Sequence, residues 1–162
     1  MATKCPVRFA VDDGRSTTTP RVTKSYSVPL SEKDSLSWGK SLLKKWTPLL
    51  ELTDWTINLT AHETGVLVTP DGEPVCMGTI AKKGTKSAII RISYDYDWNG
   101  VPGHDGFELS FVHELLHIIN VELGVDYLKK GLSEADEGRW GEYEEDHIDR
   151  HAKMLIKAFD KP

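Results

Sequence analysis

The sequence has few cysteines, no run of basic residues and no long apolar stretch. Its two cysteines, Cys5 and Cys76, lie far apart, which argues against a disulfide framework and is typical of a reducing compartment. The net charge is −5 without a cluster of Lys or Arg, so neither nucleic acid nor an anionic membrane is indicated as a partner. No segment has the apolar core of a secretion signal or the length of a membrane span. We therefore expect a cytosolic protein.

The composition is otherwise that of an ordinary globular domain, with 39% apolar and 28% charged residues. A chain of 162 residues is long enough to bury one hydrophobic core. Residues 1–30 are rich in Thr, Ser, Arg, Lys and Pro and predict an extended or disordered arm. Residues 31–162 predict a single folded domain, and we expect it to be a monomer.

The first half of this domain predicts a helix followed by a small sheet. Leucines and a tryptophan recur at near-helical spacing over residues 31–52, with Ser31 as the cap and Pro48 ending or kinking the helix. Three segments with the alternation of strands follow, and a turn over 83–85 separates the last two: 55–60, 75–82 and 87–94. We expect them to form an antiparallel sheet of three or four strands.

The segment from Asp105 to Gly124 predicts a buried helix. Asp105 is suited to cap its N-terminus, with Glu108 three residues later as in a capping box. Gly124 is suited to end the helix. Because apolar side chains cover most of the surface between these signals, we expect the helix to lie inside the protein.

A polar connection is predicted over residues 125–141, with a short helix over 132–137. A last helix is predicted over 142–161, where apolar residues at helical spacing define a buried stripe: Ile148, Ala152, Leu155 and Phe159. The order of elements is that of an α+β domain, in which a small sheet lies between an N-terminal helix and two later helices.

The buried helix contains the sequence His113-Glu-Leu-Leu-His117. Positions i and i+4 share one face of a helix, so the two imidazoles can point at a single ion. Glu114 is placed to reach a metal-bound water, as the general base of a zinc hydrolase does. A narrow polar stripe on an otherwise apolar helix consists of Ser110, His113, Glu114, His117 and Asn120. A shared metal would offset the cost of burying these groups, so the pattern predicts a zinc site.

Catalytic zinc usually takes three protein ligands and one water, so a third ligand is needed. A third His six residues after the second is absent, because position 123 is Leu. The candidates are the later glutamates: Glu134, Glu137, Glu142, Glu144 and Glu145. Helical phase favours Glu145, which precedes the apolar stripe, while Glu144 and Glu137 stay open as alternatives.

Four segments together resemble a known family. They are Trp55-Thr-Ile57, Ala88-Ile-Ile-Arg-Ile92, Val112-His-Glu-Leu-Leu-His-Ile118 and a late Glu-x-x-Ile-Asp over 145–149. The combination resembles the compact gluzincin-type metallopeptidases, which are frequent in phages and prophages and related in plan to the ImmA/IrrE-type endopeptidases. The resemblance implies a zincin-like fold, one zinc ion, and a protein or peptide substrate along an edge strand. A phage protein in the host cytoplasm would fit it.

The chemistry predicts a mechanism for this site. Zinc held by His113, His117 and Glu145 would activate a water, and Glu114 would take its proton and pass it to the leaving amine. A second donor for the developing oxyanion would come from one of four candidates: Tyr94, Tyr96, His104 and Tyr143.

Two other functions use the same helix. A deformylase-like amide hydrolase would take Cys76 as its third ligand. A non-catalytic binding module would use zinc for folding alone, with four protein ligands, the fourth from His147 or His151.

Overall fold

The computed structural model describes residues 30–69, 72–96, 98, 106–124 and 132–159. Its elements follow in this order: α1 (Glu32–Leu49), β1 (Thr56–His62), β2 (Met77–Lys82), the 3-10 turn η1 (Lys83–Thr85), β3 (Ser87–Ser93), α2 (Gly106–Leu123) and α4 (Glu134–Phe159). The α+β prediction is confirmed. The predicted arm lies outside the described residues up to position 29.

Helix α1 begins and ends where local signals place its termini. The Oγ atom of Ser31 accepts a hydrogen bond from the backbone N–H of Asp34 at 3.1 Å, which satisfies a donor that has no partner within the helix. Pro48 lies in the last turn, and the helix ends one residue later. Both the predicted cap and the predicted stop are confirmed.

The three strands form a mixed sheet in the order β1-β3-β2. Strand β3 pairs antiparallel with β2 and parallel with β1, for example through Ile57 and Ala88. The prediction of an antiparallel sheet is therefore wrong for one of the two pairings. The chain reverses through η1 and places β3 between the two earlier strands, so β3 runs in the direction of β1. Alternation of apolar residues specifies a strand but not the neighbour with which it pairs.

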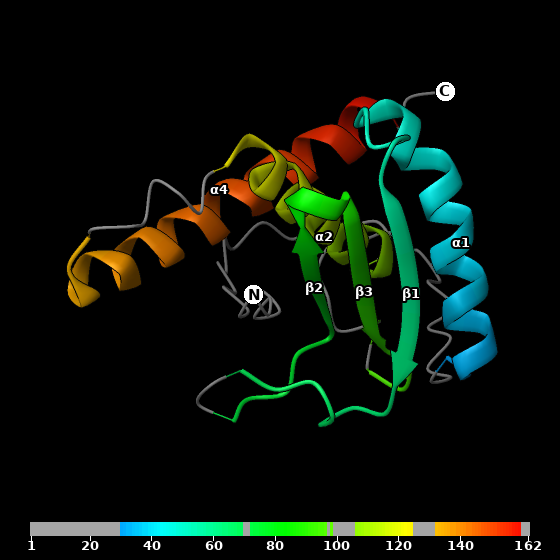
Figure 1. Cartoon of the computed structure of the whole chain (residues 1–162). Coiled ribbons are helices and arrows are strands. Elements are labelled where there is room, and N and C mark those ends of the chain that lie inside the picture. The colour runs from blue at the N-terminus through cyan, green and yellow to red at the C-terminus, as the bar shows by residue number, and fades with distance from the viewer. Residues whose placement is uncertain (1–29, 70–71, 97, 99–105, 125–131, 160–162) are drawn as a thin grey trace, which may run out of the picture.

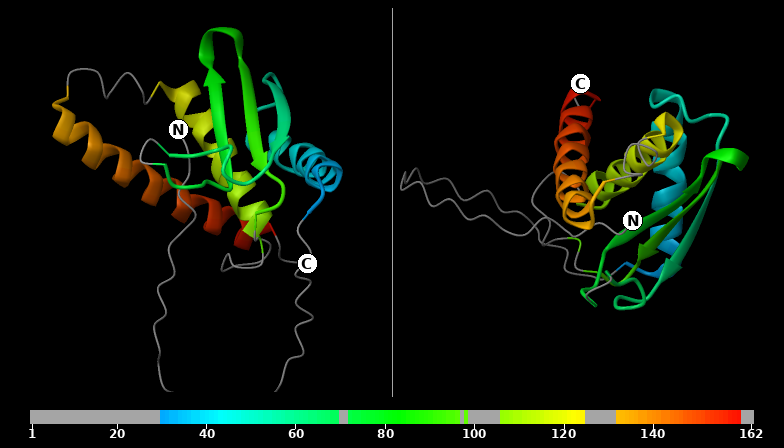
Figure 2. Two further views of the ribbon diagram at one scale, coloured as in Figure 1. Left: turned by 90° about the horizontal axis from the view of Figure 1, so that it is seen from below. Right: turned by 60° about the vertical axis from the view of Figure 1, so that its left-hand side comes forward.

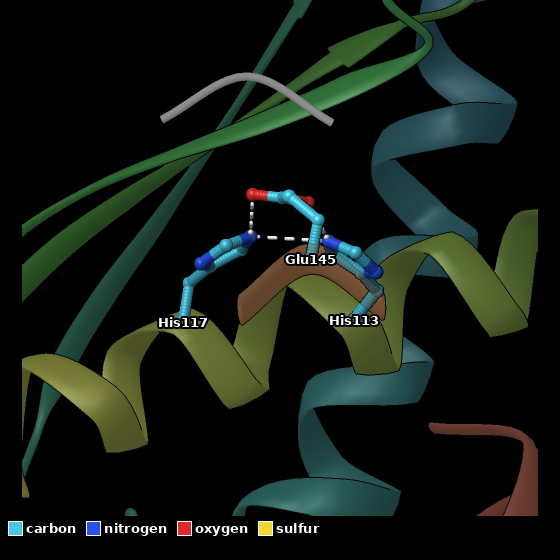
Figure 3. Close-up of side chains that lie close together, drawn as sticks. All are labelled: His113, His117 and Glu145. Atoms are coloured by element: carbon cyan, nitrogen blue, oxygen red, sulfur yellow. Dashed lines mark hydrogen bonds and ion pairs between the residues drawn. The ribbon is translucent and has the colours of Figure 1, made fainter. Parts of the chain in front are cut away.

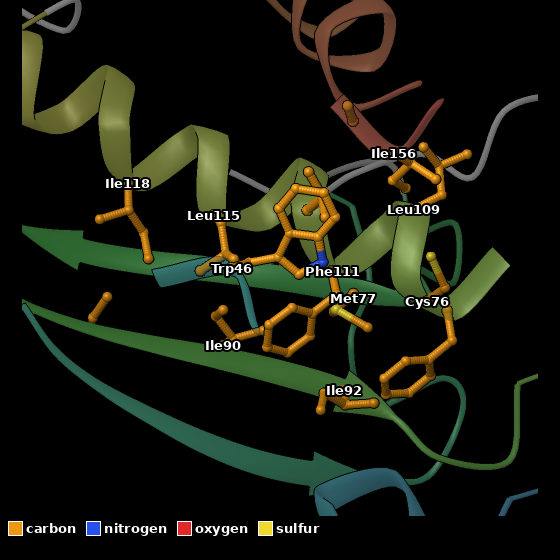
Figure 4. Close-up of a cluster of buried hydrophobic side chains, with 14 of the residues drawn as sticks. Trp46, Cys76, Met77, Ile90, Ile92, Leu109, Phe111, Leu115, Ile118 and Ile156 are labelled. Carbon is orange, nitrogen blue, oxygen red and sulfur yellow. The ribbon is translucent and has the colours of Figure 1, made fainter. Parts of the chain in front are cut away.

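The helices lie in layers on one face of the sheet (Figures 1 and 2). Helix α1 packs against β1, helix α2 packs against β2, and α4 packs on the far side of α2. The core fills the space between sheet and helices, where Ile90 and Ile92 of β3 meet Phe111 and Leu115 of α2 (Figure 4). On the opposite face of the sheet Ile89 is 40% exposed, and none of the described helices packs there.

Helix α2 is buried because the sheet covers one side of it and helix α4 covers another. The predicted cap Asp105 lies outside the described residues. The carboxylate of Glu108 instead accepts hydrogen bonds from Lys45 (2.8 Å) and Trp46 (2.7 Å) of α1. Gly124 has a φ of 76° after the last turn, which confirms the predicted end. Within the described part of the chain, no helix is both long and apolar enough to cross a bilayer.

Helix α4 is longer than the sequence predicts. The short helix predicted over 132–137 forms the start of α4, but the connection expected from there up to residue 141 is wrong, because one continuous helix begins at Glu134. Ser133 starts it: its Oγ accepts from the N–H of Asp136 at 3.3 Å. The helix runs through Gly138 and Gly141, because a glycine within a helix costs only about 1 kcal/mol relative to alanine, which a helix of this length tolerates. Residues 125–131 lie outside the described part.

Alanine in place of these two glycines should stabilise the protein. A Cβ atom at Gly138 or Gly141 meets no atom within 4 Å. We expect each substitution to raise the free energy of unfolding by about 0.5–1 kcal/mol in urea denaturation.

The matched control is Gly39→Ala in the buried part of α1. Its Cβ would lie 2.8 Å from Cδ1 of Leu59, so this variant should lose about 1–3 kcal/mol. Equal effects at Gly39 and Gly138 would contradict the packing described here.

Candidate metal centre

Helix α2 brings two imidazoles together in a buried position. His113 and His117 are 2% and 4% exposed, and their Nε2 atoms lie 3.0 Å apart. The i and i+4 spacing places both rings on the face of α2 that meets α4. In water the rings would be fully hydrated, so their burial requires partners that replace this hydration.

Glu145 of α4 supplies the first of these partners (Figure 3). Its Oε2 lies 3.1 Å from Nε2 of His113, and its Oε1 lies 3.4 Å from Nε2 of His117. One ligand atom from each of these residues lies within 4.8 Å of the other two. Two segments separated by 27 residues of chain thus form a candidate His-His-Glu metal site, here called the metal cluster.

The other predicted third ligands lie elsewhere. Glu144 is buried, and its Oε1 accepts a hydrogen bond at 2.9 Å from the side-chain amide of Asn120. Glu137 and Glu142 are exposed on α4. The side chain of Glu134 lies outside the described part. Among the alternatives, Glu145 is therefore the carboxylate that the structure brings to both imidazoles.

The donor atoms lie close enough together for one ion to contact all three residues. Zinc binds imidazole nitrogen and carboxylate oxygen at about 2.0–2.2 Å, so two of its tetrahedral ligands lie roughly 3.3 Å apart. In the metal cluster the two Nε2 atoms lie 3.0 Å apart, and the carboxylate faces each imidazole with a different oxygen, Oε2 at 3.1 Å from His113 and Oε1 at 3.4 Å from His117. Two imidazoles and a carboxylate are also a donor set that zinc accepts in hydrolases.

Asp149 orients His113, a role that the sequence did not indicate. Its Oδ1 accepts a hydrogen bond at 2.7 Å from Nδ1 of His113. With Nδ1 carrying the proton, the lone pair of Nε2 is directed into the metal cluster. Asp149 lies four residues after Glu145, one turn along the same face of α4, and this spacing was the signal available in the sequence.

The two carboxylates change the ionisation of the metal cluster in the metal-free protein. Burial disfavours the charged ring, but the hydrogen bonds to Asp149 and Glu145 outweigh it and raise the pKa of His113 to about 10. Burial also disfavours a charged Glu145, but hydrogen bonds to His113 and His117 lower its pKa to about 2. A proton on His113 therefore balances the carboxylates of α4, and a metal ion would have to displace that proton.

Glu114 is fully buried in the polar stripe of α2, next to His113. The backbone carbonyl of Glu114 accepts a hydrogen bond from Oγ1 of Thr79 at 3.3 Å. This contact joins the turn that carries Glu114 to strand β2. The position of the predicted general base is thus held by both the sheet and the helix.

The remaining predicted site residues lie away from the metal cluster. The Sγ atom of Cys76 donates to Oγ of Ser110 at 3.7 Å, one turn before the first histidine, so the prediction of Cys76 as third ligand is wrong. His147 and His151 are exposed on α4 and do not join the cluster. His104 lies outside the described residues.

The three tyrosines proposed as oxyanion donors have other contacts. The hydroxyl of Tyr94 donates to Glu63 at 3.3 Å. Tyr96 packs edge-on against Trp98, with the ring centroids 5.4 Å apart. Tyr143 is 69% exposed. These contacts of Tyr94 and Tyr96 are with residues outside the metal cluster.

Comparisons with protein-family models, curated proteins and solved structures found no match to this chain. The resemblance to gluzincin-type metallopeptidases therefore depends on the motif of α2 and on the geometry of the metal cluster.

The stability of the metal-free protein should depend on pH through this cluster. The raised pKa of His113 contributes stability that is complete below its unfolded value of 6.5 and is lost as pH rises towards 10. The lowered pKa of Glu145 contributes stability that is complete above 4.5 and is lost as pH falls towards 2. Urea denaturation in the presence of a metal chelator should therefore show the largest contribution of His113 and Glu145 to the free energy of unfolding between pH 4.5 and pH 6.5. A His113→Gln variant with the same alkaline slope as the original chain would contradict this assignment.

Asp149→Asn should weaken the binding of a divalent ion at the candidate site about 10- to 100-fold, with zinc as the test ion, because an amide no longer fixes the proton on Nδ1 of His113 as a carboxylate does. Competition with a fluorescent zinc chelator measures the change in affinity. Asp146→Asn is the matched control, since Asp146 is exposed and pairs with Arg150 at 3.2 Å. Equal losses in the two variants would mean that Asp149 acts only through the general charge of α4.

Proposed function

We propose that this protein is a zinc-dependent hydrolase that cleaves peptide bonds, with Glu114 as the general base. The observation that carries the proposal is the convergence of His113, His117 and Glu145, whose ligand atoms lie within 4.8 Å of one another. A metal with three protein ligands keeps a position for water, as catalytic zinc does and structural zinc does not.

Zinc held by His113, His117 and Glu145 would act as a Lewis acid, which would lower the pKa of a bound water and polarise a carbonyl. The residues of the chain position and protonate the reactants around it. Glu114 takes a proton from the attacking water and returns it to the leaving amine, so that the carboxylate is regenerated in each cycle. Asp149 keeps the proton of His113 on Nδ1 throughout, so the ring stays a neutral ligand.

A peptide is supported as the substrate by the strand beside the site. Strand β2 lies at one end of the β1-β3-β2 order and packs against α2. An extended peptide can pair with the backbone of such a strand, which would hold a scissile bond near the metal cluster. The family that the motif resembles binds its substrates in this way.

A zinc-stabilised binding module without catalysis is the second candidate. It needs a fourth protein ligand, and the two histidines considered for this role, His147 and His151, are exposed away from the cluster. Asp149 is placed to support His113 and not to replace the water. These two observations favour the enzyme.

Glu114→Gln should abolish turnover while zinc stays bound. Loss of a general base costs about 10²–10⁴-fold in rate, and glutamine has nearly the shape of glutamate. Turnover is measured as new amino termini that the zinc-loaded protein produces in a complex peptide mixture, counted by mass spectrometry. Zinc content is measured on the same preparation by atomic absorption.

Two further variants serve as controls for this result. Glu145→Ala should lose both zinc and turnover, whereas Glu137→Ala, which removes an exposed carboxylate of the same helix, should keep both. Full turnover in Glu114→Gln would refute the proposed mechanism. Zinc bound by the original chain and lost in Glu145→Ala, with no turnover in the original chain, would instead support the binding module.

A further inference from the structure

Helix α4 carries a second pair of imidazoles on its solvent-exposed side. His147 and His151 are both exposed, and their ring centroids lie 4.2 Å apart with the planes at 75°. The separation of four residues is the same as in the metal cluster, where the centroids of His113 and His117 are 4.9 Å apart. Residues at positions i and i+4 lie on one face of a helix, so in each pair the spacing allows one ion to reach two rings.

The ring of His151 has a defined tautomer. Its Nδ1 lies 3.0 Å from the backbone carbonyl oxygen of His147, and because a carbonyl only accepts, Nδ1 carries the proton. Nε2 of His151 then keeps its lone pair. Histidines that bind metals usually donate the other ring N–H to a carbonyl or a carboxylate in this way, as His113 does to Asp149.

The surroundings of His147 suit a cation. The ring of Tyr143 stacks on that of His147, with the centroids 6.2 Å apart and the planes at 12°. The nearby positive charge of Arg150 is paired with Asp146 at 3.2 Å, which reduces its repulsion of an approaching ion.

We infer that His147 and His151 form a second metal site, at the surface, for a divalent transition-metal ion. Copper(II) should bind most tightly, because imidazole ligands follow the general order of affinity among first-row ions. Two protein ligands leave the other positions to water, so the ion exchanges readily with solution. The inference does not depend on the proposed function, since neither residue joins the metal cluster.

Retention on immobilised copper(II) tests this site selectively. An ion fixed to a resin can reach exposed imidazoles but not the metal cluster, whose histidines are at most 4% exposed. The untagged full chain should bind the resin. His147→Gln and His151→Gln should each lower the partition of the protein onto the resin at least about tenfold. Loss of a residue that only supports a metal ligand already weakens metal binding about 10- to 100-fold, and loss of the ligand itself should weaken it at least as much. Both variants should fold, since the side chains are exposed.

Two histidines outside the pair provide the controls. His62→Gln changes a half-buried ring that interacts with Thr60, and His104→Gln changes the remaining histidine of the sequence. Both variants should be retained like the original chain. Unchanged retention after replacement of both His147 and His151, or an equal loss in His104→Gln, would overturn the inference.

Discussion

The hydrogen bonds of His113 to two carboxylates of α4 are the contacts on which the arrangement of the helices around the site depends. A buried imidazole costs free energy unless both ring nitrogens have partners, and a buried carboxylate costs more. Glu145 and Asp149 meet this requirement together because they lie one turn apart on the same face of α4. The rotation of α4 about its axis is thereby defined, since a small turn of the helix would leave all three groups unsatisfied.

Helix α2 can hold His113 opposite these carboxylates because contacts with several other elements fix the position of the helix. The sheet reaches it through Thr79, whose hydroxyl donates to the carbonyl of Glu114. Lys83 donates to the backbone carbonyl of Glu122 near the C-terminal end of the helix, where cations are favoured. At the other end, Glu108 accepts from Trp46 of α1. A rigid support of this kind keeps ligand atoms at fixed distances before any ion arrives.

Much of the candidate site could be predicted because it is local in the sequence. The phase of an α-helix relates His113, Glu114 and His117 without reference to any other element, so the motif by itself predicts a shared face. Helical phase also favoured Glu145 over Glu144, since it predicted that the side chain of Glu145 points inward together with the apolar stripe of α4. The role of Asp149 was missed because an acidic residue on a helix usually faces water, and the sequence does not reveal that an imidazole lies opposite.

By itself, the sequence determined helices α1 and α2, the three strands and the polar stripe of α2, since caps, prolines and apolar periodicity act over a few residues. Only the tertiary structure decided that β3 lies between β1 and β2, because pairing depends on segments far apart in the chain. It also decided that α4 continues through Gly138 and Gly141, where packing and length outweigh a weak local preference. The candidate metal site depends on both the local sequence and the tertiary structure. Two of its ligands follow from the helical repeat, and the third requires α4 to pack on α2, a contact that no local pattern encodes.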